Sequence, residues 1–348
     1  LPMLAKEVLD GRPTVVDVAT PYEDPSFAFG VTRRSDPVRA YVTIIEGCND
    51  FCAFCVVPYT RGHERMRAKA EILDEVRDVV ARGFREVQLL GQIVNHYQAP
   101  DDRACDFAQL LAEVNDVPGV ERIRFASPHP RHTGERLIAA VRDLPKVCKH
   151  LHLPVQSGST RVLAAMRRRH SREEYLDLVA RIREAIPAAT LSTDIIVGFP
   201  GETAWDFEQT LSLVGAVQYH GMFSFKYSPR PNTLASKRMA DDVGVDEKTA
   251  RIVALQSLQR GIQTRLHERL VGTTVGVLVD AAGRRRPRTG TADEAQVSGR
   301  TMGNTVVNFP VPPGHDGANA WVGRTVPVTI RRAGPNSLSG EAAGIDPA

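Results

Sequence analysis

The stretch that decides the fold is Tyr41-Val-Thr-Ile-Ile-Glu-Gly-Cys-Asn-Asp-Phe-Cys-Ala-Phe-Cys55, in which a short apolar run leads directly into three cysteines. The β-branched residues at 41–46 predict a buried strand. Cys48, Cys52 and Cys55 follow it with the spacing CxxxCxxC. The sequence therefore predicts a thiolate-rich loop at the carboxyl end of the first strand.

These three cysteines supply soft thiolate ligands, which select iron–sulfur clusters, zinc or copper(I). A structural zinc site and a closed 4Fe–4S cluster each need four protein ligands, and the loop supplies three. A fourth ligand such as Cys105, Cys148 or His63 would close the site. We expect instead that Cys105 and Cys148 are packed thiols and that one iron stays open. A zinc knot or a redox relay is the alternative.

The bulk composition is that of an ordinary globular protein. The chain has 348 residues, of which 42% are hydrophobic and 24% charged, and this length suits two domains. No run reaches the roughly 18–20 apolar residues that a membrane span requires, and the start does not resemble an export signal. Clustered cysteines are natural in a reducing compartment, so we expect a cytoplasmic protein without membrane contact.

Strand and helix patterns alternate along most of the chain. Each parallel strand pairing needs a crossover helix, so six such units predict a parallel sheet. Six is short of the eight that close a full barrel, and we expect an α/β fold with a partial (β/α)6 barrel. Ser171 with Glu174, and Thr203 with Asp206, form capping-box patterns at two helix starts. Strands are expected at 41–46, 86–90, 121–126, 150–155, 190–198 and 220–227, and helices at 68–82, 106–115, 133–143, 171–186, 203–217 and 246–269.

The composition and the hydrophobic pattern of the sequence change near residue 268, where we place a domain boundary. Residues 271–343 are rich in Gly and Val and contain short alternating runs, which predict a small antiparallel β-barrel of the OB-like kind. The net charge of +3 is too weak to argue for nucleic-acid binding by itself. The arginines at 284–288 are, on their own, typical of a solvated loop.

The cysteine spacing resembles that of radical S-adenosylmethionine (SAM) enzymes. In that family the three thiolates hold a 4Fe–4S cluster, and its open iron binds SAM, which an electron from the cluster cleaves to a 5′-deoxyadenosyl radical. The resemblance implies Cys48, Cys52 and Cys55 as cluster ligands and catalytic residues. Phe54 matches the place where the family packs the adenine of SAM. Such chemistry would belong to the cofactor, with the protein supplying position and exclusion of water.

Longer matches narrow the resemblance to the MiaB family of tRNA methylthiotransferases. The C-terminal segment is similar to the RNA-binding TRAM domain of that family, on Gly299-Arg-Thr, Val307-Asn-Phe and Asn336-Ser-Leu. This ordered set is far more specific than CxxxCxxC alone. It implies a radical SAM domain at 39–268 and a TRAM domain at 269–345. The catalytic-domain matches are Glu46–Gly62, Leu89–Asn95, His152–Ser159, Ser192–Thr203 and Tyr227–Pro231.

The reaction implied by the resemblance is methylthiolation of carbon 2 of isopentenyl (dimethylallyl) adenosine beside the tRNA anticodon. The radical would abstract hydrogen, SAM would also donate the methyl group, and sulfur would come through an auxiliary 4Fe–4S cluster. The target base must leave its stack, which an unpaired anticodon loop permits at low cost. The resemblance also implies an electron donor such as flavodoxin or ferredoxin, and we expect a monomer.

Polar side chains just past two of the expected strands are further candidates for cofactor binding. Gln92, Asn95, Gln156 and Ser157 carry amides and hydroxyls that can bond a ribose or a methionine carboxylate. The alternative is that they tie loops together by bonding the backbone. Asp194 lies in an otherwise apolar strand, so it is either buried with a partner or directed at the pocket.

Two groups of arginines are candidates for RNA contact. Arg61 and Arg230 follow strand ends, where they would meet the anionic backbone of an RNA loop. Surface ion pairs are the alternative. If the C-terminal segment is a TRAM domain, a contact with RNA phosphates becomes as good an interpretation of Arg284, Arg285 and Arg286 as a solvated loop.

The sequence departs from the family pattern in two places. Ile93 stands where the family usually has the second amide of Gly-Gln-Asn-Val-Asn, and Met66 precedes Arg67 where the family often has Ser. MiaB-type enzymes also begin with a domain that holds the auxiliary cluster on three more cysteines. Residues 1–38 resemble only the tail of that domain and contain no cysteine. We therefore expect the second cluster's ligands, and the sulfur-donating step, to be absent from this chain.

Three other functions stay open from the sequence. A sister methylthiotransferase would act on threonylcarbamoyl-adenosine or on a ribosomal protein, although residues 55–61 and 152–159 favour the isopentenyl branch. A catalytically silent RNA-binding protein would keep the fold without the sulfur chemistry. An electron-transfer protein would use the cluster alone.

Overall fold

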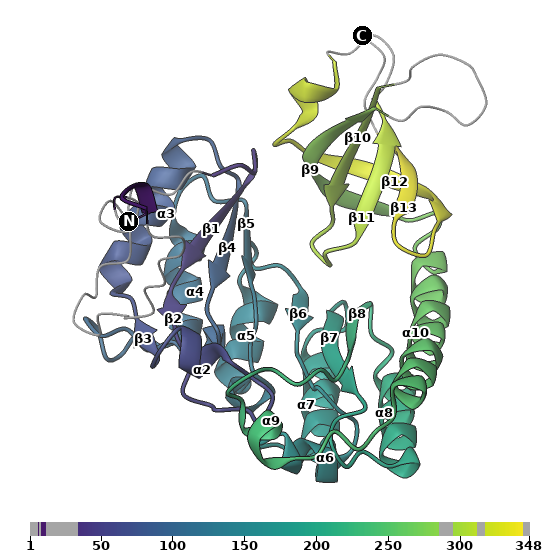
Figure 1. The fold of residues 1–348 in the computed structure, drawn as a ribbon. Helices are drawn as coiled ribbons and strands as arrows, with labels where there is room; N and C mark the ends of the chain where they lie inside the picture. Colours follow the sequence, from purple (N-terminus) through teal and green to yellow (C-terminus); the bar gives the residue numbers. More distant parts are fainter. Residues whose placement is uncertain (1–5, 7, 12–33, 285–294, 312–316, 344–348) are drawn as a thin grey trace.

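The structure is a computed structural model that describes residues 6, 8–11, 34–284, 295–311 and 317–343. Its larger part is an array of six parallel strands in chain order (Figure 1). The strands are β1 (Arg39–Thr43), β4 (Glu86–Leu90), β5 (Arg122–Phe125), β6 (His150–His152), β7 (Thr190–Val197) and β8 (Gly221–Lys226). They form two sheets, β1-β4-β5 and β6-β7-β8, with a parallel bridge from Ile123 to Val147 between them. The predicted α/β fold with six parallel strands is confirmed.

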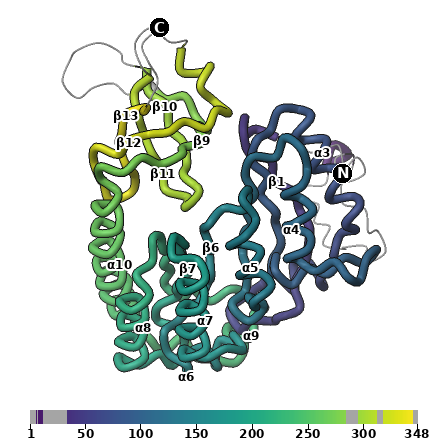
Figure 2. Tube along the Cα trace, turned by 180° about the vertical axis from the view of Figure 1, so that it is seen from behind, coloured from purple at the N-terminus to yellow at the C-terminus, as the bar shows by residue number. Residues whose placement is uncertain are grey.

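Helices cover the outer side of the strand array (Figures 1 and 2). Both predicted capping boxes are present, Ser171 with Glu174 and Thr203 with Asp206, and they fix two helix starts as expected. For each of the six long helices, both ends lie within two residues of the ends predicted from the sequence. The long helices are α3 (Lys69–Ala81), α4 (Phe107–Asp116), α5 (Glu135–Asp143), α7 (Arg172–Ala185), α8 (Ala204–Val217) and α10 (Val245–Glu268).

The first predicted strand differs from the observed structure, because residues 41–46 divide at Ile44. The N–H of Ile44 bonds the end of β4, whereas its carbonyl accepts from the N–H of Arg67. The chain thereby leaves the parallel sheet and enters a hairpin of β2 (Ile45–Glu46) and β3 (Arg65–Met66). Other short elements also escaped prediction: α2 (Val57–Thr60), η1 (Val94–His96), η2 (Pro130–His132), α6 (Thr160–Ala165) and α9 (Leu234–Arg238).

Side chains on the parallel strands alternate between a face under the helices and a face turned away from them, here called the inner face. On β7, Leu191, Thr193 and Ile195 are fully buried, and they belong to the layer that packs against the helices. Ser192 and Asp194 alternate with them and lie on the inner face. The hydrophobic core therefore lies between strands and helices, and the inner face carries polar groups.

The C-terminal part is a closed five-stranded barrel with its own core around Phe309 and Trp321. Its pairings are antiparallel except for β11 with β13, which run parallel. The predicted OB-like barrel is confirmed, with that one parallel pair as the difference. Its elements are β9 (Thr274–Arg284), β10 (Ala295–Arg300), β11 (Val306–Pro310), η3 (Ala318–Trp321), β12 (Thr325–Ala333) and β13 (Leu338–Ala342).

This barrel lies against the amino ends of the parallel strands, far from α2, α6 and α9 at the other end (Figure 1). Arg124 on β5 donates to the carbonyl of Thr301 at 2.7 Å and to Glu86 at 2.9 Å. The hydroxyl of Thr190, at the start of β7, donates to the carbonyl of Gly303 at 2.9 Å. The barrel therefore covers the amino ends, and the carboxyl ends are left for the cysteine loop.

Candidate cluster and cofactor site

The cysteine loop begins and ends at the hairpin of β2 and β3. Gly47 has φ of +72°, and a Cβ there would lie 2.1 Å from the carbonyl oxygen of His63, so only glycine fits. Ala53, in the middle of the loop, donates its N–H to the carbonyl of Met166 at 3.0 Å, and its carbonyl accepts from Ala235 at 2.8 Å. The loop is thus fixed both at its base and at its centre.

Each cysteine sulfur receives one hydrogen bond from the protein. The backbone N–H of Asp50 points to Cys48 Sγ at 3.5 Å and that of Val57 to Cys55 Sγ at 3.4 Å. The guanidinium of Arg168 donates to Cys52 Sγ at 3.5 Å. Such donors stabilise thiolates, which are the form that binds metal.

Burial opposes ionisation of two of the thiols. It raises the pKa of Cys48 to about 11, and it also raises the pKa of Cys55. Metal binding would therefore displace protons from these sulfurs near neutral pH. Cys48 and Cys55 therefore differ from reactive redox thiols, whose pKa is lowered.

The donor set fits a 4Fe–4S cluster with one open iron. Within the described ranges, no three His, Cys, Asp or Glu side chains gather closely enough to share a single metal ion. A cluster has no such need, because each thiolate binds a different iron. Cys105 and Cys148 are buried elsewhere, and Cys148 Sγ lies 3.7 Å from Met302 Sδ at the opposite end of the strands. Both are packed thiols, as predicted.

Phe54, the residue predicted to pack the adenine of SAM, lies half-buried beside the cysteines. It packs on a small apolar cluster that includes Ala53, Met166, Phe199 and Tyr227. The last two follow the carboxyl ends of β7 and β8. The ring therefore lies where the loop meets the ends of the strands, and its contact with SAM stays a prediction.

The predicted polar residues differ in how far their side chains are engaged. The side chain of Asn95 donates to the carbonyl of His129 at 2.9 Å and accepts from the N–H of His129 at 2.8 Å. It therefore joins two loops by bonding the backbone, which is the alternative to a cofactor contact. The hydroxyl of Ser157 accepts from the N–H of Ser159 at 3.2 Å. Gln92 is exposed, and Gln156 is held in a left-handed conformation by backbone bonds to β7. A cofactor contact by any of them stays a prediction.

Asp194 is one end of a polar row on the inner face. His152 Nε2 lies 3.4 Å from Asp194 Oδ1, and His152 Nδ1 lies 2.9 Å from Ser192 Oγ. Ser192 Oγ is in turn 3.0 Å from His150 Nε2. Asp194 is therefore half-buried, has His152 as a partner and lies on the inner face, and its contact with a cofactor stays a prediction.

The predicted RNA-binding arginines are only partly described. Arg61 and Arg230 are exposed, and neither forms an ion pair with any residue that the structure describes. Contact with RNA stays a prediction for both. Arg285 and Arg286 lie outside the described residues, and Arg284 is described only as the last residue of β9.

Several histidines beside the cysteine loop were missed from the sequence. His129 is buried, its Nε2 lies 3.6 Å from Asp50 Oδ2, and its ring lies 5.6 Å from that of His170. Burial lowers the pKa of His132 and of His170 to about 4. The signal that would have found His129 is its position just after β5, the same rule that selected Gln92. Arg168 follows a helix that was not predicted, and it carried no such signal.

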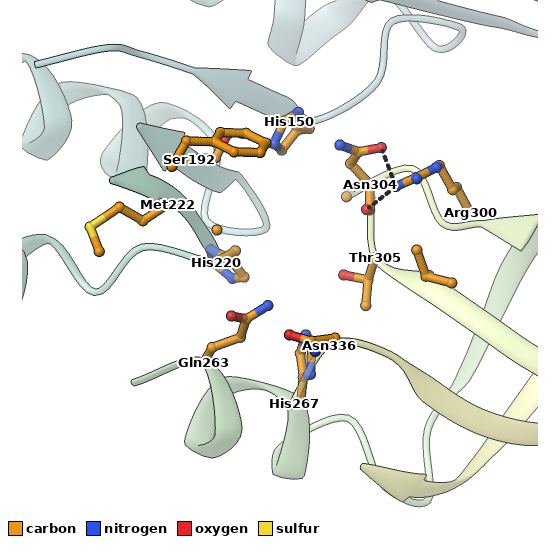
Figure 3. Close-up of a pocket in the computed structure, with 14 residues that line it drawn as sticks. His150, Ser192, His220, Met222, Gln263, His267, Arg300, Asn304, Thr305 and Asn336 are labelled. Atoms are coloured by element: carbon orange, nitrogen blue, oxygen red, sulfur yellow. Dashed lines mark hydrogen bonds between the residues drawn. The ribbon is translucent and has the colours of Figure 1, made fainter. Parts of the chain in front are cut away.

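A separate cavity of about 290 Å³ lies at the amino ends of β6 to β8 (Figure 3). His150 and His220 line it from the strand array, Gln263 from α10, and Arg300 and Asn304 from the C-terminal barrel. Burial lowers the pKa of His150 to about 3 and that of His220 to about 4, so both are neutral. This cavity is at the opposite end from the cysteines and is not the cofactor site.

Two family models match the two parts of the chain. Residues 42–214 match the Radical SAM superfamily, whose members use a 4Fe–4S cluster and SAM, and residues 268–343 match the TRAM domain. None of the helices in the described ranges could cross a membrane. Among solved structures, the radical SAM methyltransferase TsrM from Kitasatospora setae has a TM-score of 0.48 at 17% identity, over 56% of this chain and 35% of that chain.

Curated relatives extend over nearly the whole chain. A tRNA-2-methylthio-N(6)-dimethylallyladenosine synthase from Solibacter usitatus is 45% identical over 99% of this chain and 75% of the relative. Proteins of the same name from Geotalea uraniireducens and Alkalilimnicola ehrlichii are 46% and 43% identical, over 90% and 99% of this chain and 68% and 74% of the relatives.

Proposed function

The chain belongs to the family of tRNA-2-methylthio-N(6)-dimethylallyladenosine synthases, and on that premise we propose that it starts the radical reaction that methylthiolates dimethylallyladenosine in tRNA. The observation that carries the proposal is the cysteine loop at the carboxyl ends of the parallel strands, with a hydrogen-bond donor directed at each sulfur. The relatives' shared name does not favour the sister methylthiotransferases, a silent RNA-binding protein or an electron-transfer protein.

The residues of the cysteine loop and its surroundings would hold the cofactors. Cys48, Cys52 and Cys55 would hold a 4Fe–4S cluster. When bound, that cluster supplies the electron that cleaves SAM and so yields a 5′-deoxyadenosyl radical. Arg168 places a positive charge beside Cys52 and helps to hold its sulfur in position. Phe54, which packs on the apolar cluster beside the loop, would pack against the adenine of SAM.

The C-terminal barrel and two exposed arginines would bind the RNA. Arg61 and Arg230 extend from the carboxyl-end loops, where an anticodon loop has to approach, and a guanidinium pairs well with phosphate. We take residues 39–268 as the radical SAM domain and 269–345 as the TRAM domain. The protein would act as a cytoplasmic monomer, with flavodoxin or ferredoxin as electron donor.

The sulfur step would need a second 4Fe–4S cluster. The 348 residues hold five cysteines, and the two outside the loop, Cys105 and Cys148, are buried apart from each other. They offer no second site. We therefore predict that this chain cleaves SAM without forming much methylthio product on its own.

The test is an anaerobic assay of the reconstituted protein with dithionite and SAM. Formation of 5′-deoxyadenosine is expected, and mass spectrometry of added tRNA should show little or no methylthio-adenosine. An intact cluster spectrum without deoxyadenosine would contradict the radical function and leave the binding or electron-transfer readings. Efficient methylthiolation would contradict the need for ligands beyond these residues.

A further inference from the structure

Two phenylalanines on β8 are exposed in a way that the rest of the fold does not explain. Phe223 is 62% exposed and Phe225 is 52% exposed. All other phenylalanines within the described residues are buried or half-buried. Two large aromatic side chains left in water on one strand indicate a surface that binds something.

Both rings lie on the inner face of the strand array. The side chains that alternate with them turn to α10, because Ser224 Oγ accepts from Gln256 at 3.0 Å and Lys226 Nζ donates to Thr249 at 3.2 Å. Successive side chains of a strand point to opposite faces. Phe223 and Phe225 therefore point away from α10, toward the same side as Asp194.

The polar row described above lies directly beside these rings. Phe223 is opposite Asp194 in the register of β7 and β8, and its ring meets that of His152 edge-on with centroids 6.0 Å apart. The inner face thus combines an aromatic surface on β8 with a carboxylate and an imidazole on β7 and β6.

The hydrogen bonds of the polar row have a preferred direction. A carboxylate only accepts, so His152 Nε2–H faces Asp194 and His152 Nδ1 accepts from the hydroxyl of Ser192. The oxygen of Ser192 can then accept from His150, which is neutral. The single contact with His152 leaves Asp194 with lone pairs for a further donor.

We propose that Phe223 and Phe225, together with Asp194, form the receptor for the dimethylallylated adenine of the tRNA. A purine stacks on aromatic rings, and its apolar dimethylallyl group gains by leaving water for the same surface. The N6–H of the modified adenine is a donor that suits the Asp194 carboxylate. The inference rests on the proposed function and names the residues that distinguish a prenylated from an unprenylated base.

The experiment measures the affinity of the cluster-loaded protein for two anticodon stem–loop RNAs by fluorescence anisotropy. One RNA carries dimethylallyladenosine next to the anticodon and the other carries adenosine at that position. We expect the wild type to prefer the prenylated RNA by about tenfold, because stacking of the adenine is common to both RNAs and partial burial of the apolar dimethylallyl group adds roughly 1–2 kcal/mol. The double variant F223A/F225A should lose this preference, with a ratio within about twofold of unity.

Two control variants keep the result interpretable. Trp205→Ala removes an equally exposed aromatic (70%) from the outer helix α8 and should leave the preference unchanged. Phe223→Tyr keeps the ring and should retain the preference. Because both phenylalanine rings are exposed, their removal is not expected to prevent folding, which circular dichroism checks.

The outcomes separate this inference from the proposed function. A preference that survives in F223A/F225A, or a wild type without any preference, overturns the receptor assignment even if 5′-deoxyadenosine forms. A preference that depends on the two rings, in a protein that makes no deoxyadenosine, supports the receptor while contradicting the radical function.

Discussion

The two ends of the parallel strands use their polar groups in opposite ways. At the amino ends, the buried side chains of Glu86, Arg122 and Arg124 bond one another or the carbonyls of the C-terminal barrel. At the carboxyl ends, Arg168 Nε, His129 Nε2 and His170 Nε2 are buried without a hydrogen-bond partner in the described structure, and Gln259 Oε1, near the start of β8, is an exception at the amino ends. Buried polar atoms are nearly always satisfied, so such exceptions need an explanation.

This difference between the two ends indicates that the polar groups at the amino ends stabilise the fold, whereas those at the carboxyl ends serve function. Paired charges at the amino ends hold the two parts of the molecule together. At the carboxyl ends, the unsatisfied polar atoms and the three thiols lie around the place where cofactors would bind. Parallel α/β folds generally place their chemistry at the carboxyl ends, and here the opposite ends are covered by the second barrel. Substitutions at the two ends should therefore affect different measurements.

The largest expected effect comes from the cysteine loop. Cys52→Ala removes one of three cluster ligands and should lower 5′-deoxyadenosine formation by about 100-fold or more, on the scale of losing an essential group of a site that acts as a unit. Chromatography of the anaerobic reaction and the iron content of the protein measure this. Cys148→Ala, a packed thiol at the other end, should keep full iron content; equal iron loss in both variants would contradict the assignment of ligands.

A large effect on stability is expected from Arg124→Ala at the amino ends. The change leaves Glu86 with only Arg39 and removes the donor to Thr301, and breaking a buried pair costs about 3–5 kcal/mol of unfolding free energy. Denaturant unfolding measures it. The exposed pair of Arg331 and Glu341 is the matched control, because Arg331→Ala should cost about 1 kcal/mol or less. Similar losses in the two variants would show that the buried network contributes little.

A smaller effect concerns pH and His220. Burial lowers the pKa of His220 to about 4 in the folded protein, below its ordinary value, so the unfolded chain takes up the proton first as pH falls. The associated stability is present above about pH 6.5 and is lost toward pH 4. His220→Asn keeps an acceptor for the N–H of Leu191 and should flatten the decline in unfolding free energy by about 1–2 kcal/mol between pH 7 and pH 5. Parallel curves for the variant and the wild type would contradict this.

The smallest effect is expected for the exposed arginines of the carboxyl-end loops. Arg61→Ala and Arg230→Ala should each weaken tRNA binding a few-fold for all sequences and reduce the salt slope by about 1. Titrations at several salt concentrations measure both. Arg77→Ala, an exposed arginine on the outer helix α3, provides the comparison, and an unchanged salt slope in the two loop variants would remove them from the RNA contact.

Much of the fold could be predicted because the spacing of apolar residues within each segment indicates whether that segment is a strand or a helix. Apolar spacing placed the six strands and the long helices, and the capping boxes at Ser171 and Thr203 fixed two starts. The division of the first strand at Ile44 could not be predicted, because it depends on a pairing with residues that follow the cysteine loop. The pattern of residues within one segment does not show which distant segment will pair with it.

The candidate site was predictable only in part, for the same reason. The cysteines were found from spacing, and Asp194 from being polar within an apolar strand. The contact of Arg168 with Cys52 joins residues 116 positions apart, and that of Arg124 with Thr301 joins residues 177 apart. Phe223 and Phe225 looked like ordinary strand residues, because the sequence does not show that β8 is an edge strand with one face uncovered.

Electron paramagnetic resonance of the reconstituted, dithionite-reduced protein tests most directly whether three thiolates hold a cluster with one open iron. The spectrum of the reduced cluster is recorded before and after addition of SAM. We predict a signal that changes shape on addition, because SAM binds the iron that Cys48, Cys52 and Cys55 leave free. A reduced-cluster signal that SAM does not alter would mean that the fourth iron is already occupied, and it would contradict this account.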